Sequence, residues 1–93
     1  DRVWMLENAM YSILSPEGFA TILWKDSSRA PEAAELLKIT SKDLLKNGVI
    51  DKIISEENTI DILKAALITE LDTLSKLTTD ELVEARYQRF RKY

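Results

Sequence analysis

The sequence predicts a helix-rich α/β fold, in the order strand pair, three short helices, strand and two longer helices. Three observations support this prediction. Two short runs rich in residues that favour strands open the chain. A Ser-Pro-Glu sequence at 15–17 has the order of a helix start. Between residues 59 and 77, apolar residues recur every three or four positions, as on one face of a helix.

The strand pair is expected at residues 2–6 and 9–14. The turn-prone pair Glu7-Asn8 separates the two runs, so we expect a β-hairpin. The helix that follows is predicted to begin after Ser15, whose side chain can accept a hydrogen bond from a free backbone N–H.

The next two helices are short. Ser28 is the expected cap of a helix over 31–37, and Thr40 or Ser41 is the expected cap of the third helix. The Asn-Gly pair at 47–48 predicts a left-handed stop for that helix.

A strand is expected at 49–54, followed by the clearest helix, at 59–77. The apolar residues of that helix form one predicted stripe: Ile60, Leu63, Leu67, Leu71, Leu74 and Leu77. Glu70 occupies a position that a strict heptad would make apolar, which disfavours a long coiled coil. Thr78 and Glu81 have capping-box spacing and predict a last helix, with Val83, Tyr87 and Phe90 on one side.

Composition excludes several classes of function. The formal net charge is −3 and the chain has no cysteine, so neither nucleic acid nor an anionic membrane is an expected partner, and disulfides and thiolate zinc sites are excluded. No apolar run approaches the roughly 20 residues that cross a bilayer. We expect a cytoplasmic protein without a metal site.

A complete active site is not expected within the 93 residues. Without histidine or cysteine, the Ser-His-Asp and Cys-His arrangements are excluded. Gly18 and Gly48 are the only glycines, too far apart for a phosphate-cradling loop. We therefore expect an incomplete piece of a larger protein, inactive by itself.

Glu17 is the one candidate catalytic residue. A carboxylate in the first turn of a helix after a strand can face a ligand crevice, but first-turn acids also simply complement the helix dipole, and position alone favours that second interpretation. The basic end formed by Arg86, Arg89, Arg91 and Lys92 either contacts a phosphate or an acidic partner or, as we favour, places cations near the negative end of a helix. Trp4 and Trp24 either line a binding groove or pack in a core or interface, and the second is favoured because aromatic side chains bury large areas.

The detailed sequence closely resembles the carboxyltransferase α subunit of bacterial acetyl-CoA carboxylase, a member of the crotonase superfamily. The resemblance is strongest in a long segment at 5–26, and it continues at 30–40, 48–51 and 82–92. It implies the C-terminal part of a crotonase-like fold, with residues 1–58 ending the core and 59–93 forming C-terminal helices. Many α subunits carry a Gly-rich insertion after the strand at 49–54, where this chain has only Ser-Glu-Glu-Asn at 55–58.

The resemblance implies transfer of a carboxyl group from carboxybiotin, held on a carrier protein, to acetyl-CoA, giving malonyl-CoA for fatty acid synthesis. The implied partners are the carboxyltransferase β subunit, biotin carboxyl carrier protein, biotin carboxylase and the missing N-terminal part of the same subunit. Gly-rich turns upstream of these residues and the β subunit would hold the two substrates. Glu17 matches by motif the catalytic Glu of hydratases in the superfamily.

Two alternatives stay open. One is another crotonase-type acyl-CoA enzyme that uses Glu17 as general acid or base. The other is a non-enzymatic helical interaction module built on the stripe at 59–77.

Overall fold

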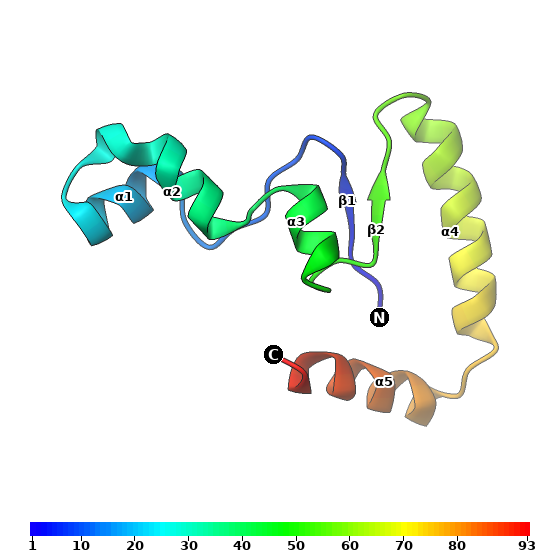
Figure 1. Cartoon of the computed structure of the whole chain (residues 1–93). Coiled ribbons are helices and arrows are strands. Elements are labelled where there is room, and N and C mark those ends of the chain that lie inside the picture. Colours follow the sequence, from blue (N-terminus) through cyan, green and yellow to red (C-terminus); the bar gives the residue numbers. More distant parts are fainter. The chain divides into compact units, whose positions relative to one another are not determined.

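The computed structural model describes all residues from 1 to 93 and divides into two compact units (Figure 1). The first unit, Val3–Glu56, contains β1 (Trp4–Leu6), α1 (Pro16–Trp24), the 3₁₀ helix η1 (Ser27–Arg29), α2 (Ala30–Leu37), α3 (Ser41–Lys46) and β2 (Lys52–Ile54). The second unit joins Asp1–Arg2 to Glu57–Tyr93 and contains α4 (Thr59–Ser75) and α5 (Thr79–Arg91). The predicted helix-rich α/β class is confirmed.

The sheet of the first unit is a parallel pair, β1 beside β2, with Met5 opposite Ile53 at its centre. Just before the pair, the Asp51 N–H donates to the Val3 carbonyl at 2.8 Å. Two parallel strands expose most of their backbone and apolar surface, so such a sheet depends on what packs against it.

The predicted hairpin is wrong. Residues 9–14 form no strand, and only an isolated antiparallel bridge joins Met10 to Thr40. The Ala9 N–H turns back to the Leu6 carbonyl at 3.1 Å, so the chain leaves the sheet directly after β1. Ile13 is 94% exposed. The strand-favouring residues of this run therefore do not pack on β1, and the true partner of β1 comes from almost fifty residues later.

The core of the first unit is small. Met5, Leu44 and Ile50 form its buried cluster, against which Val3, Ala9, Val49 and Ile53 pack in part. Beside the sheet, the buried Ser41 hydroxyl donates to the Glu7 carbonyl at 2.6 Å. This hydrogen bond fixes α3 to the end of β1 and leaves no buried polar side chain unsatisfied there.

Three predicted N-caps are confirmed, at Ser15, Thr40 and Thr78. In each, the side-chain hydroxyl accepts the backbone N–H three residues later, at 3.1, 3.4 and 3.1 Å respectively. The predicted stop of the third helix is also confirmed, because Gly48 has a positive φ of 73° just after α3. Caps are predictable because donor and acceptor lie within one turn of each other.

The predicted cap at Ser28 is wrong. Asp26 instead caps the 3₁₀ helix η1, accepting the Ser28 N–H at 3.0 Å and the Ser28 hydroxyl at 2.6 Å. α2 then begins at Ala30 without a side-chain cap. A carboxylate two residues before Ser28 is the stronger acceptor, so Ser28 becomes a donor rather than a cap.

Arg29 lies between α1 and α2 and contacts residues of both helices; we call Trp24, Asp26, Ser28, Arg29 and Glu32 the α1–α2 joint. The Arg29 guanidinium donates twice to Glu32, at 3.0 and 2.9 Å, and lies 3.9 Å from the centre of the Trp24 ring. Trp24 also meets Phe19 edge to face, at 6.2 Å between ring centres. Trp24 is half-buried and packs against Phe19 and Arg29 at the surface of the first unit.

The charges of this joint shift the pKa values of its members. Hydrogen bonds from the Ser28 side chain and backbone lower the pKa of Asp26. The hydrogen bonds between Arg29 and Glu32 lower the pKa of the Glu32 carboxyl and raise that of the Arg29 guanidinium.

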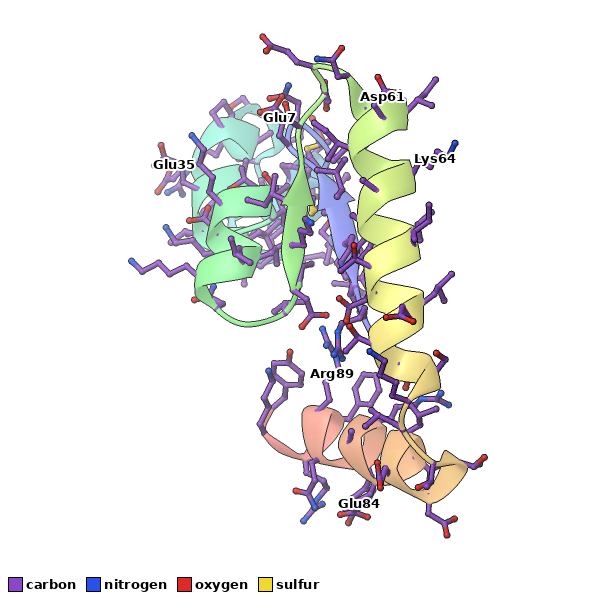
Figure 2. The ribbon with its side chains drawn as sticks, turned by 90° about the vertical axis from the view of Figure 1, so that its right-hand side faces the viewer. Glu7, Glu35, Asp61, Lys64, Glu84 and Arg89 are labelled. Atoms are coloured by element: carbon purple, nitrogen blue, oxygen red, sulfur yellow. The ribbon has the colours of Figure 1, made fainter.

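In the second unit, the apolar residues of α4 are not confined to the single predicted stripe. Its covered or half-covered apolar residues are Ile62, Leu63, Ala66 and Leu74, whereas Ile60, Leu67, Ile68 and Leu71 are exposed. At 100° per residue these are two different faces, so α4 is apolar over much of its circumference. Figure 2 shows Lys64 projecting from the exposed face.

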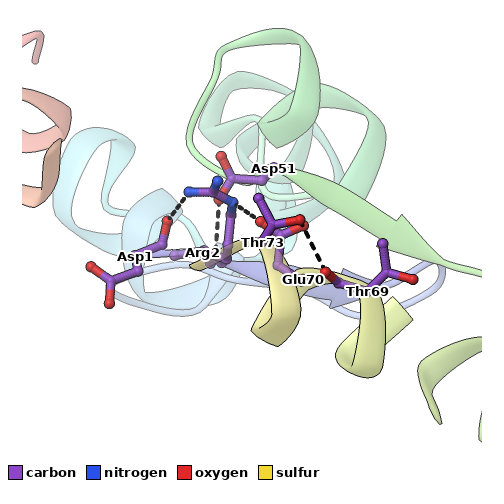
Figure 3. A network of polar contacts seen from close by, with 7 residues as sticks. Asp1, Arg2, Asp51, Thr69, Glu70 and Thr73 are labelled. Carbon is purple, nitrogen blue, oxygen red and sulfur yellow. Dashed lines mark hydrogen bonds and ion pairs between the residues drawn. The ribbon is translucent and has the colours of Figure 1, made fainter. Parts of the chain in front are cut away.

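The first two residues link the helices of the second unit. Arg2 forms an ion pair with Glu70 of α4 (Figure 3). Close to this pair, the Thr73 hydroxyl donates a hydrogen bond to the Thr69 carbonyl. The carboxylate of Asp1 accepts two hydrogen bonds from Arg86 of α5, at 3.1 and 3.0 Å. None of the helices has the length and apolar character that a membrane crossing requires.

The α1–α2 joint predicts a pH dependence of stability. Because folding lowers the pKa of Asp26 and Glu32, both contribute stability above their unfolded pKa values, about 3.9 and 4.3. That contribution is lost as the pH falls through the lower folded values. We expect the Asp26→Asn/Glu32→Gln double variant to resist urea less than the parent at pH 7, and equally well at a pH below both folded values.

The matched control is Glu35→Gln, because Glu35 is an exposed carboxylate on α2 (Figure 2). Urea titrations followed by circular dichroism would give the free energy of unfolding of the three proteins at each pH. A difference between parent and double variant that stays constant from pH 7 to pH 3 contradicts the prediction.

Candidate functional site

The first turn of α1 holds the candidate residue Glu17. Pro16 has no N–H, and the N–H groups of Gly18 and Phe19 donate to the hydroxyl and the carbonyl of Ser15, at 3.1 and 2.9 Å. Only the Glu17 N–H is left without a partner in the chain. An oxyanion hole needs convergent donors aimed at one oxygen. This turn therefore cannot hold a developing oxyanion by itself.

The Glu17 side chain is exposed, and the structure brings no second catalytic group to it. Its backbone carbonyl accepts the Thr21 hydroxyl at 2.8 Å, a contact inside the helix. A general acid or base must reach the proton it transfers, through a hydrogen bond or one water. Within this chain, Glu17 has the geometry of a first-turn acid beside the positive end of the helix dipole.

Two of the larger hollows in the first unit lie away from Glu17. One, of about 400 Å³, is lined by β1 and the segment after it, including Trp4, Met10 and Tyr11. The other, of about 460 Å³, lies between Met10, the end of α2 and the start of α3. Ligand sites combine an apolar wall with a few convergent polar groups. Neither hollow is lined by Glu17, so no catalytic candidate faces them.

The basic end is divided among separate contacts. Arg86 is paired with Asp1, the Arg91 guanidinium lies 5.9 Å from the Tyr87 ring centre, and the Lys92 ammonium lies 5.3 Å from that of Tyr93. These cations do not converge on one point. The arrangement fits cations near the negative end of a helix better than a built anion site.

A cluster of hydrogen-bonded polar side chains in the first unit lies at the carboxyl ends of the two strands. The Asn8 N–H and side-chain amide donate to the two carboxylate oxygens of Glu56, at 3.0 and 3.1 Å. In return, the Glu56 N–H donates to the Glu7 carboxylate at 2.9 Å, and the Glu7 N–H donates to the Ile54 carbonyl at 3.0 Å. We call Glu7, Asn8 and Glu56 the strand-end clamp; Glu7 is labelled in Figure 2.

Sequence reasoning missed this clamp. It interpreted Glu7-Asn8 as a hairpin turn, although the partner Glu56 lies 48 residues from Asn8. No local pattern could have found such a pair. Ligands of parallel sheets bind outside the carboxyl ends of the strands, and at this pair of strands the chain's own side chains fill that position.

Comparison with known proteins places the whole chain in one family. Residues 1–93 match the model of the acetyl co-enzyme A carboxylase carboxyltransferase-like family. The chain is 62% identical to the acetyl-coenzyme A carboxylase carboxyl transferase subunit alpha of Streptococcus thermophilus (strain ATCC BAA-491 / LMD-9). It is also 62% identical to that subunit of Streptococcus pneumoniae (strain CGSP14), and 57% identical to that of Streptococcus pyogenes serotype M12 (strain MGAS2096).

Each of these alignments covers all of this chain but only 38% of the relative. Each is 98 positions long against 93 residues here, so at least five positions of the relatives have no counterpart in this chain. The chain spans little more than a third of the curated relatives, yet the family model and the identity extend over its whole length. It belongs to the acetyl co-enzyme A carboxylase carboxyltransferase-like family.

Proposed function

We propose that this chain forms the C-terminal part of a carboxyltransferase α subunit. In the complete enzyme, the subunit would transfer a carboxyl group to acetyl-CoA, giving malonyl-CoA for fatty acid synthesis. The observation that carries the proposal is the match of all residues 1–93 to the family, together with 62% identity to a subunit of that name. Residues 1–58 would end the crotonase-like core, and 59–93 would form the C-terminal helices.

The role proposed for these residues is to support a site that other residues complete. Carboxybiotin on a carrier protein would supply the carboxyl group when bound. The thioester enolate that attacks it needs fixed backbone donors for its oxyanion. The α1 turn offers one free N–H, so these residues do not fit the oxyanion by themselves. Gly-rich turns in the missing N-terminal part, and the β subunit, would provide the donors.

The proposed partners follow from the same assignment. They are the carboxyltransferase β subunit, biotin carboxyl carrier protein, biotin carboxylase and the N-terminal part of the α subunit. Apolar side chains left exposed on α4 and α5 support the need for partners, since large exposed apolar patches mark interaction surfaces. The proposed location is the cytoplasm.

Complementation tests the proposal directly. We expect this chain, mixed with the missing α-subunit region, the β subunit, carboxylated carrier protein and acetyl-CoA, to restore malonyl-CoA formation. The chain alone should form none. A chromatographic assay for malonyl-CoA measures both.

The matched control carries Ala20→Asp, which places a charge at the fully buried Ala20 of α1 and should abolish folding and complementation together. If the parent chain is folded by circular dichroism and binds the missing region, but no malonyl-CoA forms, the proposed function is wrong.

Glu17 separates this proposal from an acid–base enzyme of the same superfamily. Because Glu17 is exposed and faces no second catalytic group, we expect Glu17→Gln in the complemented enzyme to change kcat by less than about threefold. Loss of an acid–base catalyst instead costs about 10²–10⁴-fold. Glu35→Gln, an exposed carboxylate on α2, is the control. A loss in the larger range for Glu17→Gln alone would favour the acid–base alternative.

A further inference from the structure

The only Asn-Gly pair of the chain joins α3 to the turn before β2. Asn47 ends α3 with a φ of −81° and a ψ of −1°, and Gly48 follows with a positive φ of 73°. The other two asparagines, Asn8 and Asn58, precede residues that carry a Cβ. Because glycine has no side chain, its backbone nitrogen can be approached closely. Of the three asparagine amides, that of Asn47 is therefore the one whose next residue least hinders attack by the main chain.

The reaction open to such a pair is deamidation. The Gly48 nitrogen attacks the side-chain amide carbon Cγ of Asn47, and the new C–N bond closes a succinimide ring. The bond from Cγ to Nδ2 breaks, and ammonia leaves with the proton lost from the Gly48 N–H. Water then opens the ring at either of its two carbonyl carbons, which gives aspartate or isoaspartate. Because the attack is intramolecular, it does not depend on what covers the turn from outside.

The folded turn opposes this reaction. Ring closure requires the Gly48 nitrogen to lie beside the Cβ of Asn47, because both atoms belong to a nearly flat ring. At a ψ of −1°, that nitrogen instead eclipses the backbone nitrogen of Asn47. The peptide must therefore rotate about this ψ before attack, and the rotation carries with it the chain that follows.

Hydrogen bonds and the core resist that rotation. The Gly48 N–H donates to the Leu45 carbonyl at 3.1 Å. The Val49 N–H donates to the Leu44 carbonyl at 2.9 Å. Rotation breaks both hydrogen bonds and withdraws Ile50, which is 2% exposed, from the buried cluster that it shares with Leu44. All of these contacts lie inside the first unit. Asn47 can therefore react only while this part of the core is open.

We propose that Asn47 is a deamidation site protected by the core of the first unit, so that opening of this core marks the chain irreversibly. Aspartate places a negative charge at the negative end of α3, four residues after the like charge of Asp43. Isoaspartate lengthens the main chain between α3 and β2, which displaces Val49 and Ile50 from the core. Both products oppose refolding. The proposal goes beyond the proposed function and does not depend on it.

Rates of deamidation test the protection. We expect Asn47 in the folded chain to react at least about tenfold more slowly than in a peptide of residues 43–52 in the same mildly alkaline buffer, since an opening free energy of about 1.4 kcal/mol gives that factor. In urea that unfolds the chain, the two rates should be equal. Mass spectrometry after digestion measures the reaction at each asparagine, and circular dichroism follows folding.

Two results overturn the proposal. One is a chain that keeps its helix content and still deamidates at Asn47 as fast as the peptide. The other is a chain in urea that reacts at Asn8 or Asn58 as fast as at Asn47, because Gly48 would then confer no reactivity.

Two leucines provide matched variants. Leu44→Ala removes a buried side chain beside the turn and should speed deamidation of the chain about tenfold or more, because the core then opens more often. Leu36→Ala makes the same change at a leucine that is 57% exposed, and should alter the rate by less than about twofold. The peptide with Leu44→Ala controls for a direct effect on the reaction. Equal rates in the two chains contradict protection by the core.

Refolding tests the irreversible mark. A parent chain kept in urea until Asn47 is deamidated, then returned to native buffer, should unfold at a lower urea concentration than a fresh parent chain. Asn47→Gln, kept in urea for the same time, should match its own fresh sample, because glutamine would have to close a larger and less favourable ring. If the deamidated and fresh parent chains unfold at the same urea concentration, the mark does not oppose folding and the proposal fails.

Discussion

Burial of apolar surface is the constraint on which this structure depends. The cluster of Met5, Leu44 and Ile50 is the centre of a small core, and a two-stranded sheet is only marginally stable without further packing. Meanwhile α4 keeps an exposed apolar face, and α5 buries none of its residues. Side chains cap α1, α3 and α5, so the starts of these helices are specified locally, whereas the tertiary packing available within the chain is limited.

The small core and the unburied helices limit the kind of function that the chain can have. Its polar groups are used to fix its own elements: the strand-end clamp closes the carboxyl ends of β1 and β2, and Arg29 joins α1 to α2. Ser15 uses the amide of Gly18, which leaves one donor at the turn that carries Glu17. A reacting oxyanion needs donors that are not already engaged. These residues therefore hold no complete oxyanion site, and they span only 38% of the relatives they match.

The sequence predicts whatever is decided within one helical turn. The caps at Ser15, Thr40 and Thr78 and the stop at Gly48 follow from neighbouring residues, and the position of Glu17 follows with them. Long-range pairing was not predictable: β1 joins β2 rather than residues 9–14, and Asn8 joins Glu56. Ile60, Leu67 and Leu71 of α4 belong to the predicted stripe, but their exposure was not predictable, because periodicity shows where apolar residues lie and not what covers them. By contrast, the resemblance of the sequence to the carboxyltransferase α subunit was specific enough to predict the family.

The most direct test of this account measures exposed apolar surface with a fluorescent dye that brightens on binding it. The account predicts that the folded chain alone binds the dye, and that adding the missing α-subunit region and the β subunit displaces it in proportion to the complex formed. A folded chain that binds no dye, or a complex that leaves the dye signal unchanged, would contradict it.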